Sequence, residues 1–394
     1  MSTNALSDRV NSIKPSATIA VSTLARELRA AGRDVIGLGA GEPDFDTPEN
    51  VKQAAFEAIT NGLTKYTPAD GTAELKQAVV DKFERENQLT YSPANIIVST
   101  GAKQSIINVM TALLNEGDEV IIVAPYWVSY TDMTVLSGGK AVVIDADIEQ
   151  DFKLQPEQLR EAISDRTKLL MLNSPSNPTG VAYSRQELEQ LAQVLLEYPQ
   201  VHILTDDIYE HIQWSGSPFC NIVNACPELF ERTIVVNGVS KAYAMTGWRI
   251  GFAASNETLT AAMRKIQSQT TSNPNSIAQA AAVEALNGPQ DAITVMVEQF
   301  KKRHDFIVAA LNEIDGIKCL AGDGAFYAFP DCRELIERLE GVDSDVALSQ
   351  HILNEAEVAV VPGSAFGGPG YIRLSFATSM DNLEQAMQRM QRIF

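Results

Sequence analysis

The sequence predicts an α/β protein with a large domain around a mostly parallel central sheet flanked by helices, and a smaller α/β domain formed by both chain ends. Three observations predict this class. The chain has 394 residues, which is more than one typical core needs. From about residue 95, short apolar runs alternate with segments of helical period. After a long charged segment near residues 290–314, only short strand-like runs follow.

The first strand of the central sheet is expected at residues 95–100, and Gly101 then begins a turn. Residues 103–115 place apolar side chains at helical spacing. Further strands are expected at residues 118–125, 140–147, 167–175, 201–207, 233–238 and 249–255. Continuous apolar runs of this kind suit strands buried on both faces, and their alternation with helices predicts a parallel sheet between helical layers.

The two chain ends have a different pattern. Residues 22–32 predict a helix within an N-terminal segment that has few strands. After the helix near 290–314, short strands are expected at 324–330, 357–363 and 371–377, and a last helix at 380–393. We therefore expect residues 49–290 to form the large domain, and residues 1–48 and 291–394 to form the small one.

Composition excludes several classes of function. The formal net charge of −19 repels nucleic acid phosphates and anionic membranes, so neither is expected as a partner. The four cysteines show no CxxC spacing and the four histidines no HExxH pattern, so no metal site is expected. Free thiols, an N-terminus without a signal-peptide pattern and the lack of an apolar run of about 18 residues predict a cytoplasmic protein.

Polar residues directly after strands are the first candidates for a site, because open α/β sheets bind ligands at the carboxyl ends of their strands. Gly101 and Ala102 open a helix whose N-terminus would attract an anion, although an ordinary glycine turn has the same pattern. Trp127 would stack on a flat ring or fill a core. Asn177 is held extended by Pro178, as an amide donor or as part of a turn.

Two further segments carry ionisable groups. Asp206 follows a strand, with Tyr209 beyond it, and is either a buried carboxylate with a cationic partner or a helix cap. In "SKAYAMTGWRIG", Lys241 lies among aromatic and apolar residues. Such a lysine is either a surface charge or a desolvated nucleophile. Taken together, these groups suit pyridoxal 5′-phosphate, with Lys241 holding its aldehyde and Arg249 neutralising its phosphate.

The sequence resembles the class I aminotransferases of fold type I, and more narrowly the bacterial aspartate aminotransferases of subgroup Ib. The resemblance extends over essentially the whole chain. It rests on segments in the family's order: "KPSAT" (14–18), "AGEPDFDTP" (40–48), "KYTPADG" (65–71), "GAKQ" (101–104), "PYWVSY" (125–130), "NSPSNPTG" (173–180), "DDIYEH" (206–211), "SKAYAMTGWRIG" (240–251), "GAFY" (324–327), "VAVVPGSAFG" (358–367) and "YIRLSFA" (371–377).

The resemblance implies a role for each residue around the cofactor ring. Lys241 forms the internal aldimine and, once released, acts as the general base. Asp206 pairs with the pyridinium nitrogen, Tyr209 and Asn177 hydrogen-bond the ring oxygen, and Trp127 stacks on the ring.

The resemblance also implies a phosphate site made by Gly101, Ala102 and Arg249. Many relatives add a serine at the position of Gly238, and Ser240 is the candidate substitute in this sequence. Tyr66 is expected to reach the phosphate of the neighbouring subunit, which requires a homodimer.

For the substrate, the resemblance implies that Arg373 binds the α-carboxylate as a fork, helped by the backbone around Gly41 and lined by Trp127 and Asn177. A second carboxylate would be bound by Lys103 beside Ser16 and Thr18. Lys14 matches a lysine associated with prephenate use.

The implied activity is ping-pong transamination between L-aspartate and 2-oxoglutarate, with prephenate as a further substrate. Its partners are small amino acids and 2-oxo acids. Two alternatives stay open: another fold type I aminotransferase, of the aromatic or alanine type, and a pyridoxal phosphate-dependent β-lyase.

Overall fold

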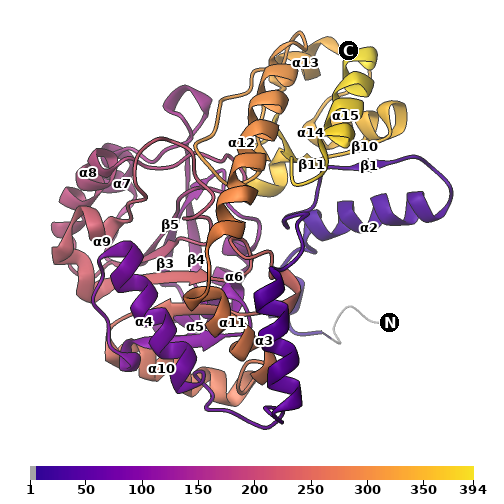
Figure 1. The fold of residues 1–394 in the computed structure, drawn as a ribbon. Helices are drawn as coiled ribbons and strands as arrows, with labels where there is room; N and C mark the ends of the chain where they lie inside the picture. Colours follow the sequence, from indigo (N-terminus) through magenta and orange to yellow (C-terminus); the bar gives the residue numbers. More distant parts are fainter. Residues whose placement is uncertain (1–5) are drawn as a thin grey trace.

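The structure is a computed structural model that describes residues 6–394. It has one large sheet with helices on both faces and a smaller part with two short sheets (Figure 1). Part of the segment used to infer that a signal peptide is absent, residues 1–5, lies outside the described residues.

The large sheet has seven strands, five of which run parallel to at least one neighbour. Their order is β2 (Ile96–Ser99), β8 (Gly251–Ala254), β7 (Thr233–Gly238), β6 (His202–Asp206), β5 (Thr167–Asn173), β3 (Glu119–Ala124) and β4 (Lys140–Asp145). Strand β8 is antiparallel to both β2 and β7, and the other pairs are parallel. The predicted mostly parallel α/β sheet is therefore confirmed.

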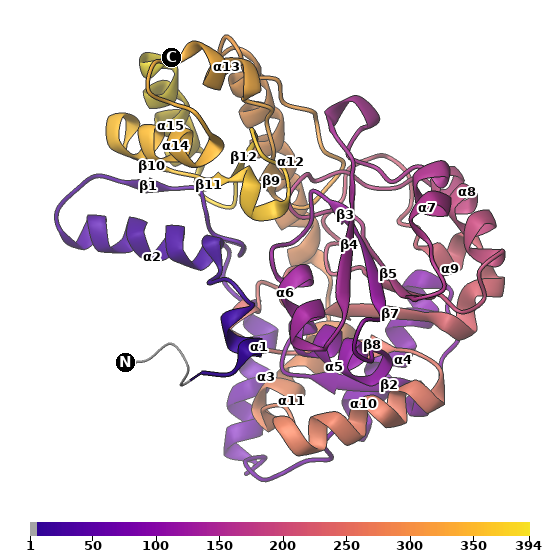
Figure 2. The same ribbon diagram turned by 180° about the vertical axis from the view of Figure 1, so that it is seen from behind.

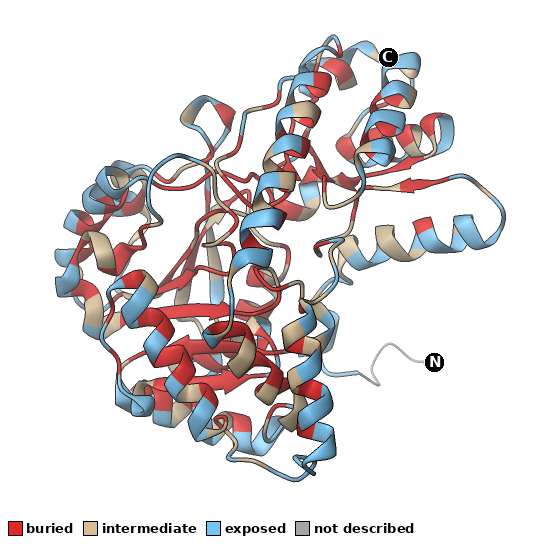
Figure 3. Cartoon of the chain, viewed as in Figure 1, coloured by how far each residue is buried: buried red, intermediate tan, exposed pale blue. Residues whose placement is uncertain are grey.

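Both faces of this sheet are buried along most of its strands (Figure 3), whereas the edge strand β4 is only partly buried and its Val143 is 43% exposed. One core joins alternate strand residues, such as Ile203 and Val235, to helices on one side. These helices are α3 (Glu49–Thr60), α4 (Ala73–Asn87), α8 (Arg185–Leu196) and α11 (Ser276–Asn287). The intervening strand residues, such as Leu204 and Val236, pack with the other side in a second core. That side has α5 (Ala102–Leu113), α6 (Ser129–Leu136) and α10 (Glu257–Thr270). The period of two explains why the strands are apolar throughout.

The smaller part combines an N-terminal segment with the C-terminal segment of the chain (Figure 2). Strand β1 (Ile36–Gly37) pairs in parallel with β10 (Val358–Ala359), and β12 (Ile372–Ser375) lies between β11 (Val361–Pro362) and β9 (Tyr327–Ala328). The helices of this region are α2 (Ala17–Ala30), α12 (Asp291–Asn312), α13 (Arg333–Arg338), α14 (Asp345–His351) and α15 (Met380–Ile393). The helices expected near 290–314 and at 380–393 are thus present, while the domain boundaries stay a prediction.

Two short helices, α7 (Pro156–Ala162) and α9 (Ile222–Ala225), connect strands of the large sheet, and α1 (Asp8–Asn11) precedes α2. Among residues 6–394, no helix combines the length and the apolar character needed to cross a membrane.

The antiparallel β8 has a consequence for the site. Because β8 runs against β7, its first residues lie at the edge where β7 ends, and Gly238 faces Gly251 in the register. Arg249, which precedes β8, therefore lies at the same edge as Lys241, which follows β7. The reversal of one strand brings the two cations of the motif to one place.

Candidate functional site

A cleft of about 530 Å³ lies between the carboxyl edge of the large sheet and the smaller part. Most of the residues predicted from the sequence line it. These are Ser16, Thr18, Gly41, Ala102, Lys103, Trp127, Asn177, Asp206, Tyr209, Ser240, Lys241, Arg249 and Arg373. They come from both parts of the chain, so the cleft depends on how the two parts pack together.

Lys241 is half-buried on the floor of this cleft, and its Nζ donates a hydrogen bond to the carbonyl oxygen of Gly41 at 2.5 Å. Burial lowers the pKa of Lys241 to about 8; Arg249 and Arg373 act in the same direction, against Glu42 and Asp206. A substantial fraction of this amine is neutral near pH 8. Lys241 therefore has the protonation state that a carbonyl nucleophile needs.

Asp206 is the last residue of β6 and is 4% exposed. Its Oδ2 accepts a hydrogen bond from the Tyr130 hydroxyl at 2.7 Å, while its buried Oδ1 has no partner among the described residues. Burial raises the pKa of Asp206 to about 6, although Tyr130, the Ile208 N–H and Lys241 oppose the shift. A buried carboxylate oxygen without a donor is suited to a cationic N–H group in the cleft.

The N-terminus of α5 and Arg249 form the anion-binding end of the cleft. Gly101 caps α5 with φ +84°, and a Cβ at this position would lie 2.8 Å from Arg249 Cζ. A Cβ on Gly251 would lie 2.7 Å from Ala102 Cα. Only glycines allow this close approach, which puts a guanidinium beside free helix N–H groups. Such a combination favours a phosphate.

Gly238 is packed closely against β8. A Cβ at this position would lie 2.9 Å from both Gly251 Cα and the carbonyl oxygen of Ile250. The close β7–β8 contact therefore leaves no room for a side chain. Ser240, 6% exposed, is the serine of this segment that lines the cleft.

Arg373 forms the opposite wall and is 1% exposed. Its Nη1 donates to Asn177 Oδ1 at 3.0 Å and its Nη2 to the carbonyl oxygen of Gly39 at 2.7 Å. Its guanidinium also lies 4.5 Å from the centre of the Tyr327 ring. The buried Nε has no partner among residues 6–394. A rigidly held, buried guanidinium of this kind is well suited to a carboxylate.

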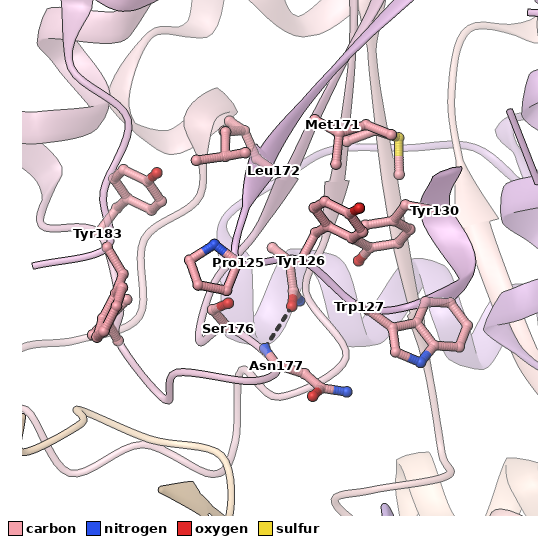
Figure 4. Close-up of a pocket in the computed structure, with 14 residues that line it drawn as sticks. Pro125, Tyr126, Trp127, Tyr130, Met171, Leu172, Ser176, Asn177 and Tyr183 are labelled. Atoms are coloured by element: carbon pink, nitrogen blue, oxygen red, sulfur yellow. Dashed lines mark hydrogen bonds between the residues drawn. The ribbon is translucent and has the colours of Figure 1, made fainter. Parts of the chain in front are cut away.

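A smaller cavity of about 30 Å³ (Figure 4) shares part of its lining with the cleft. Trp127, Tyr130 and Asn177 border both spaces. The Trp127 and Tyr130 rings meet edge to face at 5.4 Å, and the Asn177 N–H donates to Asn173 Oδ1 at 2.9 Å. These contacts hold the Trp127 ring and the Asn177 backbone in place.

The polar end of the cleft is formed by residues from α2 and α5. Lys103 Nζ lies 4.7 Å from the centre of the Trp127 ring and donates to Ser129 Oγ at 3.0 Å. Burial and the neighbouring Arg249 lower the pKa of Lys103, against Asp132. The hydroxyls of Ser16 and Thr18 lie 3.0 Å apart on the same wall.

Three predicted residues do not line this cleft. Gly101 lies behind it against Arg249. Lys14 is exposed, and its backbone N–H faces Asp132 Oδ1 at 3.5 Å. Tyr66 is 92% exposed and borders a separate surface cavity with Leu63 and Lys65. Its predicted role concerns a second subunit and stays a prediction.

Several residues of the cleft had no predicted role. Tyr130 holds Asp206, the Asn173 side chain donates to the Asp206 carbonyl oxygen at 2.8 Å, and the Tyr327 hydroxyl lies 2.8 Å from that of Tyr209. Glu42 also borders the cleft and accepts from the Thr246 hydroxyl at 2.8 Å. Tyr130 and Tyr327 belong to recognised motifs, so a phenol at the end of each motif was the available signal.

The chain is similar to known proteins over nearly its whole length. A family model described as aminotransferase class I and II matches residues 33–390. An aspartate/prephenate aminotransferase of Nitrosomonas europaea is 56% identical over 390 residues, covering 98% of both chains. The protein of the same name from Cereibacter sphaeroides is 53% identical, again over 98% of both chains.

Solved structures agree with the sequence relatives. The aspartate aminotransferase of Rhizobium meliloti superposes with a TM-score of 0.95 at 48% identity and covers 98% of both chains. The aspartate aminotransferase of Thermus thermophilus with maleate gives a TM-score of 0.92 at 43% identity over 99% of both chains. The predicted fold type is thereby confirmed.

Proposed function

The chain belongs to the class I and II aminotransferase family, as its motifs predicted, and on this premise we propose that it is a pyridoxal 5′-phosphate-dependent aminotransferase that uses L-aspartate, 2-oxoglutarate and prephenate. The names of its relatives support the reaction, since both curated relatives are aspartate/prephenate aminotransferases.

The residues of the cleft fit this cofactor. The unpartnered Asp206 Oδ1 is placed to accept from a protonated ring nitrogen, and Tyr130 keeps the carboxylate oriented. The α5 N-terminus and Arg249 suit the phosphate, and Lys241 has a lowered pKa that suits attack on an aldehyde. When bound, pyridoxal phosphate supplies the carbonyl that takes up the amino group and the ring that accepts electrons from the substrate Cα.

The chain's own residues have distinct tasks in this proposal. Arg373 binds the substrate α-carboxylate and fixes the orientation of Cα. Lys241, as a neutral amine, removes the proton from the substrate Cα. As an ammonium it then gives the proton up again, which completes the movement of the amino group. Asp206, as a carboxylate, holds the proton on the ring nitrogen. Asn177 keeps Arg373 in place, and Tyr209 contributes its hydroxyl beside that of Tyr327.

Substrate choice is assigned to the polar end of the cleft. Lys103, with the hydroxyls of Ser16 and Thr18, offers a cation and two donors to the second carboxylate of aspartate. An ammonium is a less directional partner than a guanidinium, which suits substrates of different shape. Lys14 is exposed and lies close to Ser16 in the sequence, and it is proposed to contribute to prephenate use.

We also propose a homodimer with shared sites. Tyr66 is 92% exposed, and the neighbouring helix α3 exposes Phe56 and Ile59 by 61% and 52%. A surface with several exposed large apolar side chains is typical of a subunit interface. A second copy seated there would bring Tyr66 toward its neighbour's phosphate site.

The observation that carries the proposal is the buried, unpartnered Asp206 Oδ1 in the same cleft as Lys241 and Arg373. The test mixes the purified protein with pyridoxal phosphate and then with single amino acids. We expect a visible absorption band that L-aspartate removes with release of oxaloacetate, and that 2-oxoglutarate or prephenate restores.

Other results would assign a different reaction. A protein that acquires no visible band contradicts the cofactor assignment. Removal of the band by alanine or aromatic amino acids but not by aspartate would favour another aminotransferase. Release of pyruvate and ammonia from cystathionine would favour a β-lyase.

A further inference from the structure

Helix α4 carries a lysine that is completely buried. Lys82 is 0% exposed, and its Nζ donates to Asn87 Oδ1 at 2.6 Å and to the carboxylate of Glu210. A buried ammonium is expensive to desolvate, so its partners matter. Glu210 is itself 7% exposed and comes from the loop after β6, far from α4 in sequence.

Glu210 is fully satisfied by hydrogen bonds. Besides Lys82, its Oε1 accepts from Asn237 Nδ2 at 2.8 Å, and its Oε2 accepts from Asn87 Nδ2 at 2.8 Å. Burial alone would raise the pKa of Glu210, but Lys82, His211 and these hydrogen bonds hold it below its usual value. The group is therefore a carboxylate paired with an ammonium.

This cluster is an ion-pair network and does not need a metal. The ligand atoms of Glu86, Glu210 and His211 lie within 4.8 Å of one another, as in a metal site. However, Lys82 Nζ contacts Glu210 and lies 3.6 Å from Glu86 Oε2. The ammonium supplies the positive charge that a bound cation would bring.

The network lies directly behind the catalytic strand ends. Glu210 follows Tyr209 in the chain and belongs to the loop that begins at Asp206. Asn237 ends β7 together with Gly238, just before Lys241, and its Oδ1 accepts from the Gly238 N–H at 2.7 Å. The side chain of Glu210 thus connects the segment of Asp206 and Tyr209 to the segment that leads to Lys241.

Stability alone does not explain such a buried pair, because apolar side chains of similar volume are often equally good in a core. What an apolar pair cannot do is fix two loops by directed hydrogen bonds at several atoms. Each of the two segments carries a residue that the proposed reaction uses.

We propose that Lys82, Glu210 and Asn237 are positioning residues, which set the distance between the Asp206 carboxylate and the Lys241 amine through the ends of β6 and β7. This inference rests on the proposed aminotransferase function. It predicts that neutralising the network changes the cofactor environment without a matching loss of stability.

The test compares two variants with the wild-type protein reconstituted with pyridoxal phosphate. The double variant Lys82→Met/Glu210→Gln removes both charges and keeps an amide for Asn87 and Asn237. Asn237→Ala keeps the ion pair and removes its link to β7. The control is Lys76→Met, which removes an ion pair with Asp70 (2.8 Å) from the same helix.

Three quantities are measured: the pH midpoint of the visible absorption band, kcat and KM for aspartate, and the melting temperature. We expect both variants to move the midpoint by at least about half a pH unit. We also expect them to lower kcat at least about tenfold with KM little changed. The control should leave the midpoint and kcat as in the wild type.

Folded variants with the wild-type midpoint and kcat would overturn the proposal. The same holds if Lys76→Met changes these quantities equally, since the effect would then follow from lost stability. If the double variant does not fold, Asn237→Ala decides. A wild-type protein that acquires no band instead contradicts the proposed function, so the two failures are distinguishable.

Discussion

Asp206 is a residue at which folding and chemistry make opposite demands. Its folded-state pKa is about 6, against an ordinary value of 3.8, because burial penalises the carboxylate. A raised carboxyl pKa means that the folded state binds the proton more tightly than the unfolded state. This group therefore leaves the free energy of unfolding unchanged below about pH 4. The free energy of unfolding falls as the pH rises from about 4 to about 6, and it stays at the lower value above that pH.

The first prediction is that Asp206→Asn stabilises the cofactor-free protein. A shift of about two pH units corresponds to roughly 3 kcal/mol at neutral pH, since each unit is worth about 1.4 kcal/mol. Urea unfolding of the cofactor-free proteins should show this gain at pH 7.5 and little difference at pH 4. Transamination by the same variant should fall by at least about a hundredfold, because a neutral amide cannot hold the proton on the ring nitrogen.

A difference in the free energy of unfolding that does not change with pH would contradict this account. The predicted difference comes from burying the charged form of the Asp206 carboxyl group, and that form disappears at low pH. Tyr130→Phe serves as a comparison, since it removes the donor to Asp206 Oδ2 and leaves the carboxyl group. It should raise the Asp206 pKa further and extend the loss of stability to higher pH.

The contacts of single residues in the site were only partly predictable from the sequence. Asp206 and Lys241 were predicted because each residue type matches one need of the cofactor, whereas Arg373 was predicted from the family resemblance alone. Tyr130 was not assigned to Asp206, because the two residues are 76 positions apart and only the packing of α6 brings the hydroxyl to the carboxylate.

At the scale of the element, β7 and β8 form the contact that places both cations of the motif. Their close approach depends on two facing glycines, Gly238 and Gly251. A Cβ at 238 would lie 2.9 Å from the backbone of β8, which has no flexible side chain to move aside. Any side chain here must push the strands apart.

The second prediction follows for Gly238→Ser, which restores the serine of many relatives. We expect the free energy of unfolding to fall by about 1–3 kcal/mol, as for other overpacked sites. The affinity for pyridoxal phosphate should fall as well, since the displaced β8 carries Arg249. Gly247→Ser is the matched control, because nothing lies within 4 Å of its Cβ position.

Urea unfolding and absorbance titration with the cofactor measure the two effects. Tighter cofactor binding by Gly238→Ser than by the wild type would contradict the steric explanation. It would mean that the chain accommodates the serine and gains a phosphate ligand.

The central sheet was predictable strand by strand, because apolar runs, glycine turns and helical periods are local signals. The direction of β8 was not, since its apolar run reads the same whether the strand runs parallel or antiparallel. That direction decides whether Arg249 lies beside Lys241 or at the opposite edge of the sheet. Pairing with β2 and β7 settles it, and this information is not local.

At the scale of the whole molecule, the cleft combines residues from both chain ends with the central sheet. Arg373 on β12 reaches the Gly39 carbonyl oxygen and Asn177, so it joins three distant parts of the chain. The sequence predicted these residues through family motifs, while their distances depend on how the smaller part packs on the sheet.

Tyr66, one of the predicted site residues outside the cleft of its own chain, is exposed together with the apolar side chains of α3. If a second copy covers this surface, each phosphate site contains a tyrosine from its neighbour. A site is then defective when either its own lysine or its neighbour's tyrosine is missing. This arrangement can be tested by mixing two defective proteins.

The third prediction concerns mixtures of Lys241→Ala and Tyr66→Ala proteins. Lys241→Ala has no amine for the reaction, and Tyr66→Ala should bind the cofactor weakly. In a mixed dimer, the subunit with Lys241 receives Tyr66 from its partner, so one complete site appears. Because half of the randomly reassorted dimers are mixed and each has one complete site of two, activity should recover to about a quarter of the wild-type value at limiting cofactor.

The measurement is aspartate transamination after the two proteins are unfolded together and refolded, compared with each protein refolded alone. Activity equal to the mean of the two parents would mean that Tyr66 acts in its own subunit or not at all. Recovery that requires reassortment, and that is absent when the proteins are simply combined, would place one residue of each site on the neighbouring chain. It would also make dimer formation a condition for activity, so that dilution below the dimer dissociation constant should weaken cofactor binding and lower turnover together.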